Sequence, residues 1–241
     1  MRGTRFLLLL ILLLVTSYTY AQEHRLEVRK IAKNVWVHTS YNTFQGTTVP
    51  SNGMVISTSD GVVLIDTAWG DEQTEQLLTW IKENLKQPIK MCIVTHSHSD
   101  RMGSIDVLQQ KHVAVFSSAQ TAQLAAAQEL NTPDPTLPLD QELRVGNQRL
   151  ITFYPGAGHT PDNLVVYLPK QKILFGGCLV KDAQAKDLGN VADADLKSWP
   201  KAIQKLQQQF PRAKVVVPGH GKWSGQIALS HTLYLLQQQN Q

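Results

Sequence analysis

The chain has 241 residues with 23 basic and 19 acidic side chains, which gives a formal net charge of +4. The basic residues form no stripe with interleaved aromatic side chains, so the charge offers no support for a nucleic-acid partner. The length is sufficient for one well-packed α/β domain.

The first 21 residues have the pattern of a secretory signal peptide. A positive stretch at 1–5 precedes an apolar run at 6–15, and the small-residue site Thr19-Tyr20-Ala21 follows. The run is short for a membrane span, and an uncleaved anchor is the alternative interpretation. We expect residues 1–21 to be removed and residues 22–241 to form one periplasmic domain with no stable membrane association. The mature chain would keep 21 basic against 19 acidic residues, because Arg2 and Arg5 are lost.

The first half of this domain begins with a predicted hairpin, in which apolar runs at 53–57 and 62–66 flank the pair Asp60-Gly61. Leucines and isoleucines at helical spacing predict a helix over 71–85. The apolar run 89–95 predicts a buried strand. It ends directly at His96-Ser97-His98-Ser99-Asp100.

The second half repeats this order. Apolar runs at 163–168 and 172–175 flank a turn, a helix is predicted from about Asp195 to Phe210, and a strand at 213–217 leads into the turn that carries His220. Two similar halves predict an α/β fold in which two sheets pack face to face with helices outside, a four-layer αββα sandwich. Helices at about 118–128 and 225–238 would complete the outer layers, and the prolines of 132–138 predict a loop between the halves.

Side chains that can bind metal follow the predicted strands at four places. The first place is the segment 96–100, and three later glycine-rich turns contribute one group each. The six residues are His96, His98, Asp100, His159, Cys178 and His220. Zinc favours imidazole nitrogen, thiolate sulfur and carboxylate oxygen, so we predict a two-metal hydrolytic centre with three histidines on one side. The alternatives are solvated loop histidines and a helix-capping role for Asp100.

The two cysteines receive different predictions. An exported chain with two cysteines could form a disulfide, but Cys92 lies inside a predicted strand, where a small buried hydrophobe is the usual role. Cys178 lies in a Gly-Gly-Cys turn that we expect to expose its thiol. A free thiol in an oxidising compartment is explained if a metal holds it as thiolate.

In four motifs the chain resembles the metallo-β-lactamases, in the dizinc subclass that uses a cysteine ligand. The motifs are His-Ser-His-Ser-Asp-Arg-Met-Gly at 96–103, Pro-Gly-Ala-Gly-His-Thr-Pro-Asp-Asn at 155–163, Gly-Gly-Cys-Leu-Val-Lys at 176–181 and Val-Pro-Gly-His-Gly at 217–221. The first is shared across a wider hydrolase superfamily, whereas the third is far more specific. Thioesterase, lactonase and tRNA-processing members usually have a histidine at the position of Arg101 and a bridging aspartate at that of Cys178.

The resemblance implies roles for further residues. Lys181 would bind the substrate carboxylate, and Asn190 would lie near the lactam carbonyl oxygen, where it could stabilise a developing oxyanion. Residues 41–50 would form a mobile flap. Phe44 and Val49 would cover apolar substrate groups and Trp69 would form a wall, while Asp66 and Arg101 would orient the ligands. The alternatives are a solvated lysine, a turn asparagine and ordinary aromatic packing.

The activity that the resemblance implies is hydrolysis of the β-lactam ring amide of penicillins, cephalosporins and carbapenems, giving antibiotic resistance. A zinc-bound hydroxide would attack the carbonyl, with two Zn²⁺ per chain and Asp100 assisting proton transfer. We expect a monomer whose partners are small β-lactams. A thioesterase or lactonase on the same fold and a non-catalytic zinc-binding protein are the alternatives. The sequence has no Ser-x-x-Lys accompanied by the Lys-Thr-Gly block of serine enzymes.

Overall fold

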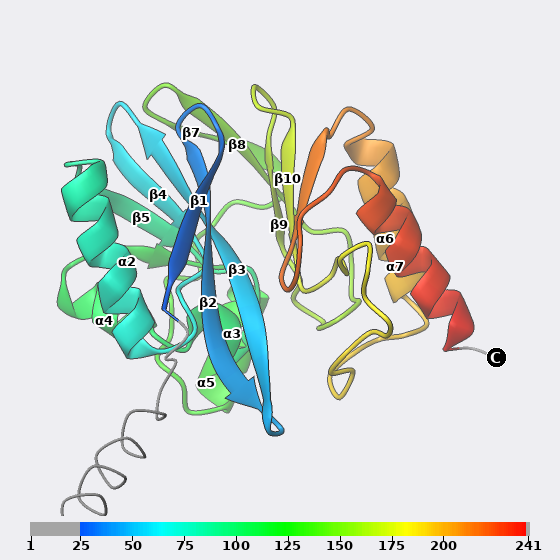
Figure 1. The fold of residues 1–241 in the computed structure, drawn as a ribbon. Helices are drawn as coiled ribbons and strands as arrows, with labels where there is room; N and C mark the ends of the chain where they lie inside the picture. The colour runs from blue at the N-terminus through cyan, green and yellow to red at the C-terminus, as the bar shows by residue number, and fades with distance from the viewer. Residues whose placement is uncertain (1–24, 240–241) are drawn as a thin grey trace, which may run out of the picture.

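The computed structural model describes residues 25–239, so the predicted signal peptide lies outside the described residues. Two sheets form the centre of this region (Figure 1). The six-stranded sheet has the order β1-β2-β3-β4-β5-β6, with β1 Glu27–Ala32, β2 Val35–Phe44, β3 Thr47–Thr58, β4 Gly61–Ile65, β5 Ile89–Ile93 and β6 Val115–Phe116. The five-stranded sheet has the order β11-β10-β9-β8-β7, with β7 Gln141–Val145, β8 Gln148–Phe153, β9 Val165–Leu168, β10 Ile173–Gly177 and β11 Val215–Pro218.

Helices cover the outer face of each sheet (Figure 1). They are α2 Asp71–Asn84, α3 Ser99–Met102, α4 Ile105–Gln110, α5 Ala119–Ala127, α6 Trp199–Gln209 and α7 Ile227–Gln238. In the described part of the chain, no helix combines the length and apolar character needed to cross a membrane.

Three hydrophobic clusters correspond to the three interfaces of a four-layer sandwich. Strand β4 shows how: Val63 and Ile65 pack in the cluster between the sheets, while Val62 and Leu64 pack in the cluster beneath α2. A third cluster joins α6 and α7 to the outer face of the second sheet. A strand buried on both faces needs apolar residues at every position, which is why β4 is a continuous apolar run. The predicted αββα sandwich is confirmed.

The predicted internal repeat is also present. Strands β3 and β4 form an antiparallel hairpin, and β4 then pairs in parallel with β5 across the helix α2. Likewise β9 and β10 pair antiparallel, and β10 pairs in parallel with β11 across α6. Each half therefore contains a hairpin followed by a strand–helix–strand crossover, the connection that parallel strands require.

Some predicted boundaries were wrong. Helix α6 begins at Trp199 instead of about Asp195, because the Asp195 carboxylate accepts hydrogen bonds from the backbone N–H groups of Lys197 and Ser198 and forms a turn there. Strand β3 begins six residues before the predicted run, and the ladder between β2 and β3 continues to the pair Phe44–Thr47. This hairpin and the segment 180–198 extend past the same end of the sheets (Figure 1).

Candidate metal centre

Three histidines from the two halves face one another at this end. His96 and His98 follow β5, and His159 follows β8. The ring centroids lie 4.9 Å apart for His96–His98, 5.2 Å for His96–His159 and 5.1 Å for His98–His159. One nitrogen from each ring lies within 4.8 Å of the others, close enough for a single ion to contact all three.

The state of these imidazoles fits a metal. His96 Nε2 and His159 Nδ1 are buried and have no hydrogen-bond partner among residues 25–239. Burial lowers the pKa of His96 and of His159 well below the usual value, and neighbouring His98 lowers it further in both cases. Both rings are therefore neutral, which is the form of histidine that binds a metal ion.

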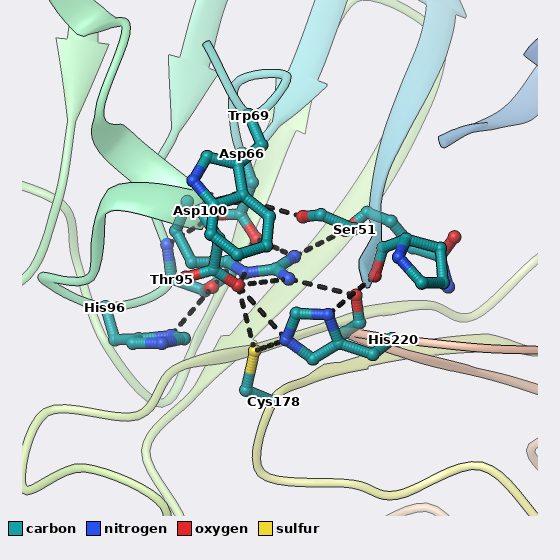
Figure 2. Close-up of polar contacts among 12 residues, drawn as sticks. Ser51, Asp66, Trp69, Thr95, His96, Asp100, Cys178 and His220 are labelled. Carbon is teal, nitrogen blue, oxygen red and sulfur yellow. Dashed lines mark hydrogen bonds and ion pairs between the residues drawn. The ribbon is translucent and has the colours of Figure 1, made fainter. Parts of the chain in front are cut away.

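A second group combines Asp100, Cys178 and His220, which point toward one another in Figure 2. Cys178 Sγ lies 3.5 Å from Asp100 Oδ2 and 3.3 Å from His220 Nε2, and that nitrogen lies 3.2 Å from Asp100 Oδ2. Burial would lower the pKa of His220, but the sulfur and the carboxylate raise it to about 9. Their charge thus favours a cation at this position. Donor atoms of His96, Asp100 and Cys178 also lie within 4.8 Å of one another, so the two groups adjoin.

Two of the histidines also have a ring nitrogen in contact with an oxygen of the protein. His220 Nδ1 lies 2.7 Å from the carbonyl oxygen of Pro50 on β3, which leaves Nε2 directed at Asp100 and Cys178. His98 Nε2 lies 2.9 Å from the carboxylate of Asp193. Such contacts fix which nitrogen of an imidazole is free for a metal.

The buried guanidinium of Arg101 lies beneath the group formed by Asp100, Cys178 and His220. Its Nε and Nη2 donate to Asp100 Oδ2 at 2.9 and 2.7 Å, and Nη2 also donates to the carbonyl oxygen of Gly219 at 2.9 Å. Nη1 donates to the carbonyl oxygen of Asn52 and lies 3.5 Å from Asp66. Burial alone would raise the pKa of Asp100, but Arg101 and the hydrogen bond to His220 hold it well below its usual range.

Asp66 is the second carboxylate of this network. Its two oxygens accept from the Thr95 backbone N–H at 2.8 Å and the Thr95 hydroxyl at 2.9 Å. Burial raises the pKa of Asp66 to about 7, against the opposing effect of Arg101 and Thr95. Since Thr95 directly precedes His96, Asp66 fixes the backbone from which the first histidine extends.

The predictions for the two cysteines had different outcomes. Both are free and Cys92 is fully buried in β5, as expected. The prediction that the turn exposes Cys178 was wrong, because Cys178 is only 1% exposed. The backbone of Gly219 packs directly on it, and a Cβ at Gly219 would lie 2.6 Å from the sulfur. Its sulfur points toward Asp100 and His220, so the chain buries this thiol while directing it at the candidate metal position.

A cavity of about 670 Å³ opens over both groups. Its walls include all five residues that the resemblance assigned to substrate contact: Phe44, Val49, Trp69, Lys181 and Asn190. Lys181 was weighed against a solvated surface lysine, yet it is only 9% exposed. Burial lowers the pKa of Lys181, and the negative charges of Cys178 and Asp100 oppose that change. The Asn190 side chain accepts from the Ala192 backbone N–H at 3.1 Å, so it also serves as a turn residue.

Sequence reasoning missed three residues of this site. Asn52 donates side-chain hydrogen bonds to the carbonyl oxygens of Pro218 and Gly221, joining the two sheets. Asp193 contacts His98 across 95 positions of sequence, and Trp199 packs against His159. No local pattern marks Asn52 or Asp193. Trp199 lies within the helix predicted from about Asp195 to Phe210, and nothing in the pattern marked it as part of a site.

Comparisons with known proteins agree with this geometry. Residues 46–220 match the family described as the metallo-beta-lactamase superfamily. A type 2 metallo-beta-lactamase of Bacillus cereus is 43% identical over 211 residues, covering 88% of this chain and 82% of that protein. A solved metallo-beta-lactamase from Pontibacter korlensis is 61% identical with a TM-score of 0.86, covering 88% of this chain and 99% of that one. The solved mono-zinc form of the metallo-beta-lactamase FIM-1 from Pseudomonas aeruginosa is 36% identical with a TM-score of 0.85, covering 91% and 98%.

Proposed function

The chain belongs to the metallo-β-lactamase superfamily, and from that premise we propose that it hydrolyses the ring amide of β-lactams with the help of bound zinc. The observation that carries the proposal is the position of one buried lysine. Lys181 lines the same cavity as the two candidate metal groups, three residues after Cys178. A metal centre beside a cationic side chain suits a substrate in which a carboxylate adjoins the bond to be cleaved.

We assign two zinc ions to the chain. One would be held by His96, His98 and His159, and the other by Asp100, Cys178 and His220. Bound zinc activates water as a nucleophile near neutral pH and polarises a carbonyl group. The donor set fits this metal, because neutral imidazoles, a thiol and a carboxylate are the groups that zinc selects.

The protein side chains bind and orient the substrate. Lys181 pairs with the carboxylate beside the ring nitrogen, and the amide of Asn190 donates to the lactam carbonyl oxygen as negative charge develops there. The departing ring nitrogen takes its proton from water, either directly or with the assistance of the Asp100 carboxylate, which Arg101 orients. Phe44 and Val49 on the β2–β3 hairpin, together with Trp69, cover apolar groups of the substrate.

The assay that tests this function uses a chromogenic cephalosporin with the zinc-loaded protein, before and after treatment with a chelator. We expect ring opening that the chelator abolishes and added zinc restores. A parallel thioester and a lactone substrate should remain intact. Hydrolysis of the thioester or the lactone, with the β-lactam ring of the cephalosporin left intact, would favour the thioesterase or lactonase alternative. No hydrolysis of any substrate at full zinc loading would leave a non-catalytic zinc-binding protein.

We further propose that penicillins, cephalosporins and carbapenems are all substrates, and that the enzyme acts as a periplasmic monomer that confers antibiotic resistance. Expression of the full chain in a bacterial host should yield a periplasmic protein whose first residue is near Gln22. Amino-terminal sequencing of that protein checks the prediction. A membrane-bound protein that keeps Met1 would contradict it.

A further inference from the structure

We propose that Trp199 is a positioning residue for substrate recognition: its indole ring holds the ammonium of Lys181 in place and thereby sets the preference for substrates that carry a carboxylate. The inference rests on the proposed function, since it concerns the substrate of the same site. Trp199 is the first residue of α6 and is fully buried, so it does not line the cavity itself.

The first observation is the environment of the lysine. Lys181 Nζ lies 5.3 Å from the centroid of the Trp199 ring, within the range of a cation–π contact. Within residues 25–239, no carboxylate lies within 4 Å of this ammonium. A buried cation without a paired anion is costly to maintain. The aromatic face is therefore the close attractive contact of the ammonium until a substrate carboxylate arrives, beside the longer-range attraction of Cys178, Asp100 and Asp187.

The second observation is how firmly the ring is held. Trp199 Nε1 donates to the carbonyl oxygen of Leu179 at 2.8 Å. On its other side the ring meets His159, with centroids 5.8 Å apart. A Cβ at Gly158 would lie 3.1 Å from Trp199 Cδ1 and 2.3 Å from Leu179 Cδ1, so the glycine backbone packs closely on both side chains. The hydrogen bond to Leu179 and the packing against His159 and Gly158 thus hold the ring between the turns that carry His159 and Cys178.

The third observation is that the backbone beside the lysine is fixed independently. The backbone N–H of Lys181 donates to Thr232 Oγ1 on α7 at 2.9 Å. With the main chain fixed at Thr232 and at Leu179, the remaining freedom lies in the four-carbon side chain of the lysine. The Trp199 face removes that freedom, and a preorganised ammonium binds a carboxylate at a smaller entropic cost.

The test compares Trp199→Phe, which keeps an aromatic face, with Trp199→Met, which keeps apolar bulk without one. For a cephalosporin with a free carboxylate, we expect Trp199→Met to raise KM about 2- to 30-fold with little change in kcat. The KM for the methyl ester of the same cephalosporin should stay at the wild-type value. Trp199→Phe should stay within about twofold of wild type for both substrates. In a Lys181→Ala background, Trp199→Met should have no further effect on KM.

Phe210→Leu is the matched control. Phe210 belongs to the same hydrophobic cluster and packs on Phe153 and Tyr167, away from the cavity. It should lower stability while leaving the ratio of acid to ester KM unchanged. Equal changes of KM for acid and ester in Trp199→Met would overturn the proposal, since they indicate a general loss of packing. If Trp199→Met does not fold, a full acid-specific rise of KM in Trp199→Phe would equally overturn it.

A binding measurement separates this proposal from the proposed function. Benzylpenicillin opened by alkali keeps its carboxylate, and its binding to the zinc-loaded protein can be followed by calorimetry without turnover. We expect weaker binding to Trp199→Met than to wild type by the same 2- to 30-fold, that is, about 0.5–2 kcal/mol. A wild-type protein that opens no β-lactam yet shows this difference would refute the proposed function alone. Equal binding by both proteins, or no binding by wild type, refutes the role of Trp199.

Discussion

Serine in place of Cys178 will lower the zinc content toward one equivalent per chain and sharply reduce turnover, while the fold remains largely intact. Serine is nearly isosteric, but its hydroxyl is a far weaker zinc ligand than a thiolate. The three-histidine group does not include this residue and should keep its ion. Loss of a residue that only orients a metal ligand typically lowers metal affinity about 10- to 100-fold. Since Cys178 is itself the expected ligand, we expect a larger fall in zinc affinity at the second position.

The other cysteine provides the control for this experiment. Cys92 is buried in β5, packs in the hydrophobic cluster beneath α2 and belongs to neither donor group, so Cys92→Ala should keep two zinc equivalents. Metal analysis after dialysis, kcat with a chromogenic cephalosporin and circular dichroism together measure the three expected effects. Two zinc ions retained by Cys178→Ser would show that the sulfur is not a ligand.

Replacement of Arg101 by methionine should cost about 3–5 kcal/mol of unfolding free energy, the usual loss when one partner of a buried ion pair is removed. The guanidinium is fully buried and contacts two carboxylates and two backbone carbonyl oxygens. Without it, the buried carboxyl group of Asp66 would have no cation beside it, and Asp100 would keep only His220. We also expect weaker zinc binding, because Arg101 fixes the orientation of the Asp100 carboxylate.

Urea unfolding of the wild type and the variant, with and without zinc, measures this change. The control is Arg144→Met, because Arg144 is 73% exposed and pairs with Glu142 at the surface. That substitution should change stability by less than about 1 kcal/mol. If Arg101→Met lowered the free energy of unfolding as little as the control does, the buried ion pairs and hydrogen bonds of Arg101 would contribute nothing beyond packing.

The parts of the fold that the sequence predicted are those in which local pattern and final environment coincide. Strand β4 is apolar at every position because both its faces are buried, and the hairpin at Asp60-Gly61 follows from turn chemistry alone. The start of α6 was placed too early because Asp195 forms a turn of its own, which competes with the helix.

In the candidate site, too, the sequence predicted some residues and not others. The donors stood out because each follows a strand, and the ends of adjacent strands meet. The contact between Asp193 and His98, and the contact between the Trp199 ring and Lys181, depend on how a loop and a helix dock on the second sheet. Side chains from distant segments meet there with no periodic signal in the sequence. The burial of Cys178 depends on the close approach of Gly219, which follows β11, and a turn motif alone cannot reveal this approach.

Both donor groups draw on both halves of the internal repeat. The first takes two imidazoles from the early half and one from the late half, and the second takes a carboxylate from the early half and a thiol and an imidazole from the late half. Neither half alone could therefore assemble either group as it stands here. A half-length ancestor would have had to dimerise to hold a metal in this manner, and gene fusion would have made the pairing permanent.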